Sequence, residues 1–177
     1  MKGFAVAQRP IALWRALADD VLVVLAGALA LAVSARIKVP IGPVPITAQT
    51  LAVLLIGGLL GPKRGTLSVL TYLAAGASGL PVFAYGGGML YFCGATGGYL
   101  VGFVPAACLV GLLTAGGRGR KPVTALAALL AGDAVIFAFG LSWVALFFPE
   151  KFALLIFLPG EALKIAIAGV VLNCLRR

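Results

Sequence analysis

The segment "VTALAALLAGDAVIFAFGLSWVALFF", residues 123–148, contains 26 residues and a single ionisable side chain, that of Asp133. A helix needs about 20 consecutive, mostly apolar residues to cross a bilayer, so this segment predicts a membrane-spanning helix. The rest of the chain has the same character, because 62% of its 177 residues are hydrophobic, 11% are charged and the mean hydropathy is +1.14. Soluble domains are about half apolar and about a quarter charged. The composition therefore predicts an all-α integral membrane protein.

Five further stretches are apolar enough to be spans. They are Val21–Ala35, Thr47–Gly61, Gly65–Ser78, Thr96–Ala115 and Phe152–Leu175. We therefore expect six transmembrane helices in a single domain that covers residues 1–177. The second and third spans are short, which indicates tilted helices or helices that end below the surface where protein covers them.

The positive charges predict the orientation of these spans, because cytoplasmic loops of membrane proteins are enriched in lysine and arginine. With the N-terminus inside, the inner segments hold ten of the fourteen basic residues. These ten are Lys2, Arg9, Arg15, Lys63, Arg64, Arg118, Arg120, Lys121, Arg176 and Arg177. The outer loops hold Arg36, Lys38 and Lys151. We expect a multi-pass protein of the cytoplasmic membrane with both termini inside.

The N-terminal residues have no short apolar core followed by a small-residue cleavage site, so they are interpreted as mature sequence. Within them, residues 4–17 ("FAVAQRPIALWRAL") are interpreted as an amphipathic segment at the membrane interface, anchored by Trp14.

Two connections on the expected outer side are unusual. Residues 38–50 ("KVPIGPVPITAQT") contain three prolines within six residues, which predicts an extended, stiff segment. Residues 79–98 ("GLPVFAYGGGMLYFCGATGG") are uncharged, aromatic and rich in glycine. We expect this loop to fold back over the helix ends, because non-helical backbone at membrane depth must be buried in protein or line a cavity. A site beneath these loops opens outward.

Glu161 and Lys164 are two ionisable residues inside the apolar stretch "FLPGEALKIAIAG", residues 157–169. Helical residues three positions apart share a face, and Glu before Lys is the favourable order. Counted from Phe152 at about 1.5 Å per residue, they lie ~13 and ~18 Å from the outer end of the helix, near mid-membrane. Each charge facing lipid costs about 2.5–3.5 kcal/mol. We therefore expect both side chains to face the interior of the bundle.

This pair is either a structural pair that neutralises itself or a site for a ligand with hydrogen-bonding groups and an anion. Pro159 and Gly160 favour the second interpretation, because they weaken the helix and free backbone groups to line a cavity. Lys164 then pairs with the anionic group, and Glu161 accepts hydrogen bonds from N–H donors of the ligand.

Other polar residues leave two interpretations open. Asp133 is either a buried acid bonded to another helix or a pocket residue. Thr47 and Gln49, at the outer start of the second span, are either helix-capping residues or hydrogen-bonding residues of a pocket.

The first span is rich in small residues, and Ala26/Ala30 and Ala28/Ala32 have the small-xxx-small spacing that permits close helix approach. This stripe serves either internal packing or docking of another membrane protein.

The sequence lacks the residues that several classes of function require. The chain has no histidine, and its three cysteines are scattered, so neither a metal site nor a disulfide framework is expected. The segment 57–65 ("GGLLGPKRG") lacks the Lys-Ser/Thr end of a phosphate-binding loop. Basic residues do not alternate with aromatic ones, which excludes a nucleic-acid partner. We expect no enzyme activity and no cofactor, and any ATP-driven step requires another subunit.

Three motifs in order resemble the BioY family, the biotin-specific substrate-binding (S) subunits of energy-coupling-factor (ECF) transporters. They are "GPVPITAQTLAVLLIGGLLGPKRGTLSVLTYLAAGASGLPVFA" (42–84), "GATGGYLVGF" (94–103) and "LPGEALK" (158–164). The sequence departs from the family pattern at three positions. Ala95 replaces a proline, Glu161 replaces an aspartate, and Tyr85 replaces a small residue in the loop over the pocket.

The resemblance implies a six-helix ECF S-component fold that captures biotin from outside with high affinity. It also implies a membrane coupling subunit and two cytoplasmic ATPases as partners. Ala26 and Ala30, with their small-xxx-small spacing, are the expected docking residues. Biotin has a carboxylate, a ureido ring with two N–H donors, and an apolar thiophane body. The expected substrate-binding residues are Glu161, Lys164, Gln49, Thr47, Phe83, Tyr85, Tyr91, Gly97, Gly98 and Tyr99. The four aromatic side chains pack on the rings, and the two glycines allow close backbone approach.

Two other functions compete with biotin uptake. One is an S subunit for another small vitamin, such as thiamine or riboflavin. The other is a membrane-embedded enzyme that uses Glu161 and Asp133 as acid and base, although the sequence lacks a nucleophile or metal set for it.

Overall fold

The structure is a computed structural model that describes residues 8–39, 45–149 and 158–175. The described residues form five α-helices, two very short strands and two 3-10 turns. In chain order these elements are α1 (Gln8–Ser34), β1 (Lys38–Val39), β2 (Ile46–Thr47), α2 (Gln49–Ala77), η1 (Met89–Cys93), α3 (Gly97–Thr114), η2 (Arg118–Arg120), α4 (Pro122–Phe147) and α5 (Leu158–Leu175). The all-α prediction is confirmed.

Four of these helices are long and apolar enough to cross a membrane, namely α1, α2, α3 and α4. Many large apolar side chains on the helices are exposed, including Leu22, Leu29, Leu146 and Val170, each at least 64% exposed. Exposed apolar side chains in such numbers are costly in water, and lipid is the solvent in which they are stable. The predicted spans Thr96–Ala115 and Val123–Phe148 differ from α3 and α4 by one residue at each end.

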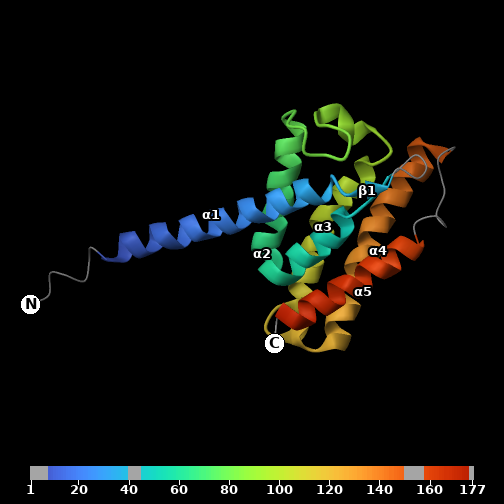
Figure 1. The fold of residues 1–177 in the computed structure, drawn as a ribbon. Coiled ribbons are helices and arrows are strands. Elements are labelled where there is room, and N and C mark those ends of the chain that lie inside the picture. The colour runs from blue at the N-terminus through green and yellow to red at the C-terminus, as the bar shows by residue number, and fades with distance from the viewer. Residues whose placement is uncertain (1–7, 40–44, 150–157, 176–177) are drawn as a thin grey trace, which may run out of the picture.

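The second and third predicted spans are two halves of one helix, α2, with a break at Gly61. Gly61 has φ 79° and ψ 179°, a conformation open essentially only to glycine, and Pro62 follows it without an N–H to donate. The two halves run in different directions on either side of this point (Figure 1). The predicted end of the second span at Gly61 therefore coincides with a break in the helix. Residues 62–64, which were predicted to connect the second span to the third, are helical.

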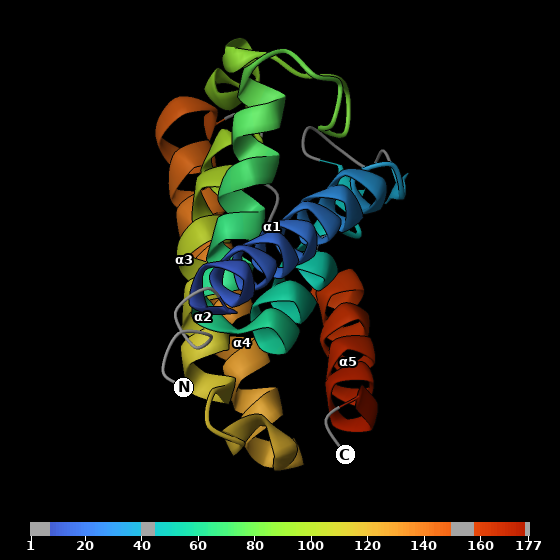
Figure 2. The ribbon, with the colours of Figure 1, turned by 90° about the vertical axis from the view of Figure 1, so that its left-hand side faces the viewer.

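The first predicted span, Val21–Ala35, agrees to within four residues with the membrane-compatible stretch Leu17–Ser34. The helix itself is longer, since α1 is already helical at Gln8. The residues of the expected interfacial segment that the structure describes, from Gln8 onward, continue directly into this helix, and Trp14 is 70% exposed on it. The helix lies across the bundle, and its N-terminal half extends beyond the other helices (Figures 1 and 2). Gly27 allows this crossing, since a Cβ there would lie 2.4 Å from the Ser68 hydroxyl oxygen of α2.

The core lies where α2, α3, α4 and α5 meet, and α3 has its closest packing with α2 and α4. Its largest fully buried side chains include Tyr72, Phe83, Leu54, Leu129, Ile136 and Leu172. Phe83 belongs to the connection between α2 and α3, residues 78–96, which is called the α2–α3 loop below. This loop covers one end of the bundle (Figure 1), as expected for an apolar, glycine-rich segment.

The proline-rich connection after α1 forms a small hairpin, in which Lys38 pairs with Thr47 and Val39 pairs with Ile46. Its tip, residues 40–44, and the predicted start of the last span at Phe152 lie outside the described residues. In the described part, α5 begins at Leu158, with Pro159 next.

Candidate functional site

A cavity lies where α2, α3 and α5 begin, beneath the α2–α3 loop and beside the hairpin. Its lining consists of Pro45, Ile46, Thr47, Gln49, Thr50, Phe83, Ala84, Tyr91, Thr96, Tyr99, Leu100, Phe103, Phe137, Glu161 and Lys164. Its volume, taken as the space open to the centre of a water molecule, is about 40 Å³. The site is therefore a small, mostly apolar and aromatic cavity with a few polar groups.

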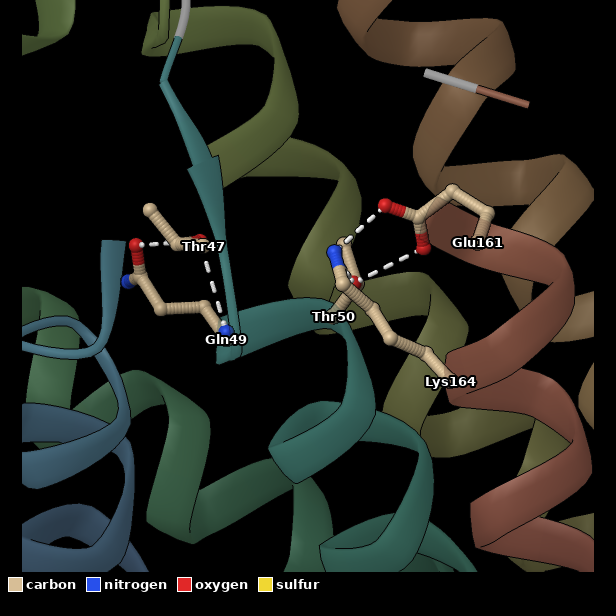
Figure 3. Close-up of polar contacts among 5 residues, drawn as sticks. All are labelled: Thr47, Gln49, Thr50, Glu161 and Lys164. Atoms are coloured by element: carbon tan, nitrogen blue, oxygen red, sulfur yellow. Dashed lines mark hydrogen bonds and ion pairs between the residues drawn. The ribbon is translucent and has the colours of Figure 1, made fainter. Parts of the chain in front are cut away.

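Glu161 and Lys164 form a bonded network with Thr50 on one wall of the cavity (Figure 3). Lys164 Nζ donates to Glu161 Oε1 at 2.5 Å and to the Thr50 hydroxyl at 3.0 Å. The Thr50 hydroxyl donates to Glu161 Oε2 at 3.0 Å. The side chains of Lys164 and Glu161 are only 12% and 8% exposed, which confirms that both charges face the interior of the bundle.

Glu161 and Lys164 line the cavity together with Phe83 and Ala84 of the α2–α3 loop, so the pair is close to the loop-covered end of the bundle. The depth expected by counting from Phe152 stays a prediction, because residues 150–157 lie outside the described residues.

Gln49 and Thr47 form a second polar group on the opposite wall (Figure 3). The Thr47 hydroxyl donates to Gln49 Oε1 at 3.2 Å and accepts from the Gln49 backbone N–H at 3.3 Å. Gln49 Nε2 donates to the Tyr72 hydroxyl at 2.6 Å. Both residues therefore line the cavity. The N-cap residue of α2 is Ala48, which makes no side-chain capping bond, so the structure favours the pocket interpretation of Gln49 over the capping one.

Aromatic rings build the rest of the wall. The rings of Phe83 and Tyr91 are 4.8 Å apart, and Phe83 also packs edge-on against Tyr72 at 5.4 Å. On the other side, the rings of Tyr99 and Phe137 pack edge-on at 5.8 Å. Burial raises the pKa of the Tyr91 phenol in the α2–α3 loop, so this hydroxyl stays protonated at neutral pH and can donate.

The α2–α3 loop is held over the cavity by two basic residues that precede the hairpin tip. Arg36 donates to the carbonyl of Pro81, and Lys38 donates to the carbonyl of Ala84. The Lys38 ammonium also lies 3.8 Å from the centre of the Tyr85 ring, a cation–π contact. Since Ala84 and Phe83 line the cavity, these contacts fix its roof.

The family model of the BioY family matches residues 7–177. This chain belongs to the BioY family. The resemblance seen in the three sequence motifs is therefore confirmed over almost the whole chain, including α1 and the residues after Lys164.

Named relatives of the BioY family and a solved structure agree with this membership. The chain is 43% identical over 145 residues to the probable biotin transporter BioY of Pyrococcus horikoshii. This match covers 78% of the present chain and 85% of the relative. It is 36% identical over 168 residues to the biotin transporter BioY of Rhizobium etli, covering 86% and 90%. A crystal structure of the S-component for biotin from an ECF-type ABC transporter matches with a TM-score of 0.81 and 28% identity, covering 92% of this chain and 93% of that one.

Two features of the sequence interpretation are thereby confirmed. The fold is that of an ECF S-component. The chain is not an enzyme, because the BioY relatives are named as transporters.

The structure brings seven of the ten expected substrate-binding residues of this BioY chain to the cavity. They are Thr47, Gln49, Phe83, Tyr91, Tyr99, Glu161 and Lys164. The other three are not among its lining residues. Tyr85 is 57% exposed in the α2–α3 loop, where its ring contacts the Lys38 ammonium. Gly97 and Gly98 pack within the protein, where a Cβ would lie 1.9 Å from the Phe92 carbonyl oxygen and 2.2 Å from Trp143 Cβ, respectively.

Thr50, Thr96, Phe103 and Phe137 line the cavity but were not expected from the sequence. Thr50 had no clear signal, because it is an uncharged residue at the start of an apolar helix and Thr47, three positions before it, belongs to β2. Phe103 and Phe137 also gave no signal in the sequence. Each lies in an apolar run, and helix packing alone decides which side of that run faces the cavity.

The small-residue stripe of α1 divides into two faces. Ala28 and Ala32 pack against the core. Ala26 and Ala30 instead line an open, almost entirely apolar groove between α1 and the first half of α2, with a volume of about 450 Å³. Internal packing thus applies to Ala28 and Ala32, while docking stays a prediction for the face that contains Ala26 and Ala30.

Proposed function

We propose that this chain captures biotin from outside the cell and carries it across the cytoplasmic membrane as the S-component of an ECF transporter. The observation that carries the proposal is the Glu161–Lys164 pair, which opens onto an aromatic cavity closed by a loop. The relatives named as biotin transporters, and the similar fold of an S-component for biotin, support the choice of biotin.

The chemistry of biotin fits the groups around the cavity. Glu161 accepts from ureido N–H donors, and Lys164, whose ammonium has three N–H bonds, offers a donor to a carboxylate or carbonyl oxygen. The apolar thiophane body packs on the rings of Phe83, Tyr91, Tyr99 and Phe137. The cavity of about 40 Å³ is smaller than the typical ligand pocket of 300–1,000 Å³. Binding therefore includes movement of the roof, and the α2–α3 loop is the element that opens.

Isothermal titration of the purified protein in detergent tests this function. Biotin is expected to bind with nanomolar affinity, while thiamine and riboflavin at excess neither bind nor compete. Binding of another vitamin but not of biotin would support the competing S-subunit function. Biotin should be recovered chemically unchanged, and its conversion would indicate the membrane enzyme instead.

Two substitutions locate the site. Lys164→Ala and Glu161→Ala are each expected to abolish biotin binding, since each leaves a buried charge without its partner and removes a ligand contact. Leu163→Ala is the matched control, because Leu163 lies between them on α5 and is 64% exposed. Wild-type affinity in both variants, with folding verified by thermal unfolding, would remove the site assignment.

The proposed topology has six membrane crossings and both termini in the cytoplasm. The excess of lysine and arginine on the expected inner segments supports it. So does the arrangement of the chain, because η2 and the C-terminal end of α5 lie at the end of the bundle opposite the α2–α3 loop (Figure 1). In this topology the two halves of α2 count as separate crossings. A cytoplasm-specific reporter fused to the C-terminus should be active, and activity of a periplasm-specific reporter there would contradict the proposal.

The proposed partners are a membrane coupling subunit and two cytoplasmic ATPases, as the S-component fold implies. The open groove that contains Ala26 and Ala30 is the expected docking place for a helix of the coupling subunit. Its wall is almost wholly apolar, and small residues permit the close approach on which helix association in lipid depends.

A further inference from the structure

Tyr72 of α2 contacts both a wall and the roof of the cavity, although it is not among the residues that line it. It is buried within the bundle, only 1% exposed. Its hydroxyl accepts a hydrogen bond from Gln49 Nε2 at 2.6 Å and donates one to the Val82 carbonyl of the α2–α3 loop at 3.4 Å. Its ring also packs edge-on against Phe83 of this loop. A single buried side chain therefore joins Gln49, on the cavity wall, to the roof.

The hydrogen bonds around Gln49 have one consistent direction, because both ends of the chain of bonds are backbone groups. The Val82 carbonyl can only accept, so the Tyr72 hydroxyl donates to it and accepts from Nε2. The Gln49 backbone N–H can only donate to the Thr47 hydroxyl, which in turn donates to Oε1. The amide nitrogen therefore points to Tyr72 and the amide oxygen to Thr47, as drawn for Gln49 and Thr47 in Figure 3. With the amide turned over, Tyr72 would donate to Oε1 and the Val82 carbonyl would lose its bond.

We propose that Tyr72 is a positioning residue that passes the closed position of the roof to the amide of Gln49. When the α2–α3 loop is closed, the Val82 carbonyl accepts from the Tyr72 hydroxyl, whose oxygen is then left to accept from Nε2. Gln49 is thereby held in one orientation, and each of its two polar amide atoms has the capacity for one further bond. The wall then offers an N–H donor and a carbonyl lone pair at fixed places to a ligand with amide-like groups, such as a ureido ring. When the loop opens, this restraint on Gln49 is released together with the roof.

Hydrogen exchange of the ligand-free protein in detergent tests the link to the roof, and it does not depend on which solute binds. The amides of Phe83, Gly86 and Gly88 are hydrogen-bonded in the closed loop, so their exchange reports opening of the roof. Tyr72→Phe keeps the ring and removes the hydroxyl, and these amides are expected to exchange about 2–10-fold faster than in wild type. Gln49→Leu leaves the bond between the tyrosine hydroxyl and the roof in place and should exchange at the wild-type rate. Equal rates in wild type and Tyr72→Phe would overturn the proposal.

Isothermal titration with biotin tests the positioning role, and this part rests on the proposed function. Tyr72→Phe is expected to bind at least about fivefold more weakly than wild type, because the Gln49 amide is no longer held. Gln49→Leu also weakens binding. Since Tyr72 acts through Gln49, the double variant is expected to lose less than the product of the two single losses, by at least about threefold. A double variant that loses the full product would contradict this role.

Ser68→Ala is the matched control. Ser68 is a fully buried residue of α2 whose hydroxyl donates to a backbone carbonyl, that of Arg64, at 2.9 Å, and it does not line the cavity. It is expected to leave both loop exchange and biotin affinity unchanged, with the Tm of every variant as the check on folding. Equal effects of Ser68→Ala and Tyr72→Phe would overturn a specific role of Tyr72. Failure of the wild type to bind biotin would instead count against the proposed function, while hydrogen exchange would still decide whether Tyr72 holds the roof.

Discussion

Thr50 connects the two charged side chains of the cavity, since its hydroxyl donates to Glu161 and accepts from Lys164, both at 3.0 Å. Threonine is uncharged and does not stand out in an apolar helix, yet here it fixes the separation and orientation of an ion pair. The binding chemistry therefore depends on three side chains, and not on the ion pair alone.

Replacing Thr50 by valine keeps the shape of the side chain and removes both hydrogen bonds. A buried polar group left unpaired costs about 1–3 kcal/mol, so biotin affinity is expected to fall roughly 5–150-fold, as measured by isothermal titration. Thr50→Ser retains the hydroxyl and should bind within a few-fold of wild type. Equal loss in both variants would show that the methyl group, and not the hydroxyl, matters.

At the scale of elements, α3 and α4 approach so closely that glycine is required at their contact. A Cβ at Gly98 would lie 2.2 Å from Trp143 Cβ and 2.6 Å from the Phe139 carbonyl oxygen. These atoms belong to the backbone of α4 or are attached directly to it, so they cannot move independently of the helix. This contact also places Tyr99, the next residue on α3, against the cavity.

Gly98→Ala is therefore expected to destabilise the protein by about 1–3 kcal/mol, because overpacking forces the helices apart. Thermal unfolding in detergent measures this effect as a lower Tm. Gly169→Ala on α5 is the control, since its Cβ would meet nothing closer than Leu129 at 3.9 Å. Alanine favours helix over glycine by up to about 1 kcal/mol, so the control Tm should be unchanged or higher. A Tm for Gly98→Ala equal to that of the control would contradict this packing argument.

The α2–α3 loop, as the roof of the cavity, controls how fast ligand leaves. Lys38→Met removes the bond to the Ala84 carbonyl and the cation–π contact with Tyr85, the latter worth about 0.5–2 kcal/mol. Dissociation of labelled biotin is expected to accelerate about 2–30-fold. Lys121→Met, an exposed lysine next to α4 at the other end of the bundle, should leave the rate unchanged. If the two variants dissociate equally fast, the roof is not held by Lys38.

At the scale of the whole molecule, ligand capture and partner docking use separate surfaces. The cavity lies among α2, α3, α4 and α5, whereas the open groove lies between α1 and α2. Because α1 lies across the bundle (Figure 2), the groove is accessible from the side of the bundle. The groove and the cavity have no lining residue in common.

Filling the groove should therefore impair transport and spare binding. Ala26→Trp and Ala30→Trp each add a side chain that covers about 150–250 Å², and cellular biotin uptake is expected to fall at least about tenfold while the affinity measured by titration stays at the wild-type value. Leu29→Trp, at an exposed position of α1 outside the groove, is the control. Unchanged uptake in the alanine variants would argue against this face as the docking surface.

The sequence by itself determined the membrane class, the approximate extent of α3 and α4, the break near Gly61 and the two charged residues of the site. These features follow from local composition, because apolar length, proline, glycine and a charge in an apolar run act at their own positions. The sequence did not show that the helix of the first span extends back to Gln8. A helix can continue through polar residues into solvent or interface, so the end of an apolar run does not mark the end of a helix.

Only the tertiary structure decided which faces of the helices meet. It placed Thr50 between Glu161 and Lys164, turned Phe103 and Phe137 into the cavity and directed Gly97 and Gly98 to internal contacts instead. In a soluble helix the polar face marks the surface, whereas in lipid both the exterior and the interior of the bundle are apolar. Hydrophobic periodicity therefore carries little information on how each helix is rotated about its own axis. Close packing of glycines and aromatic rings fixes that rotation instead.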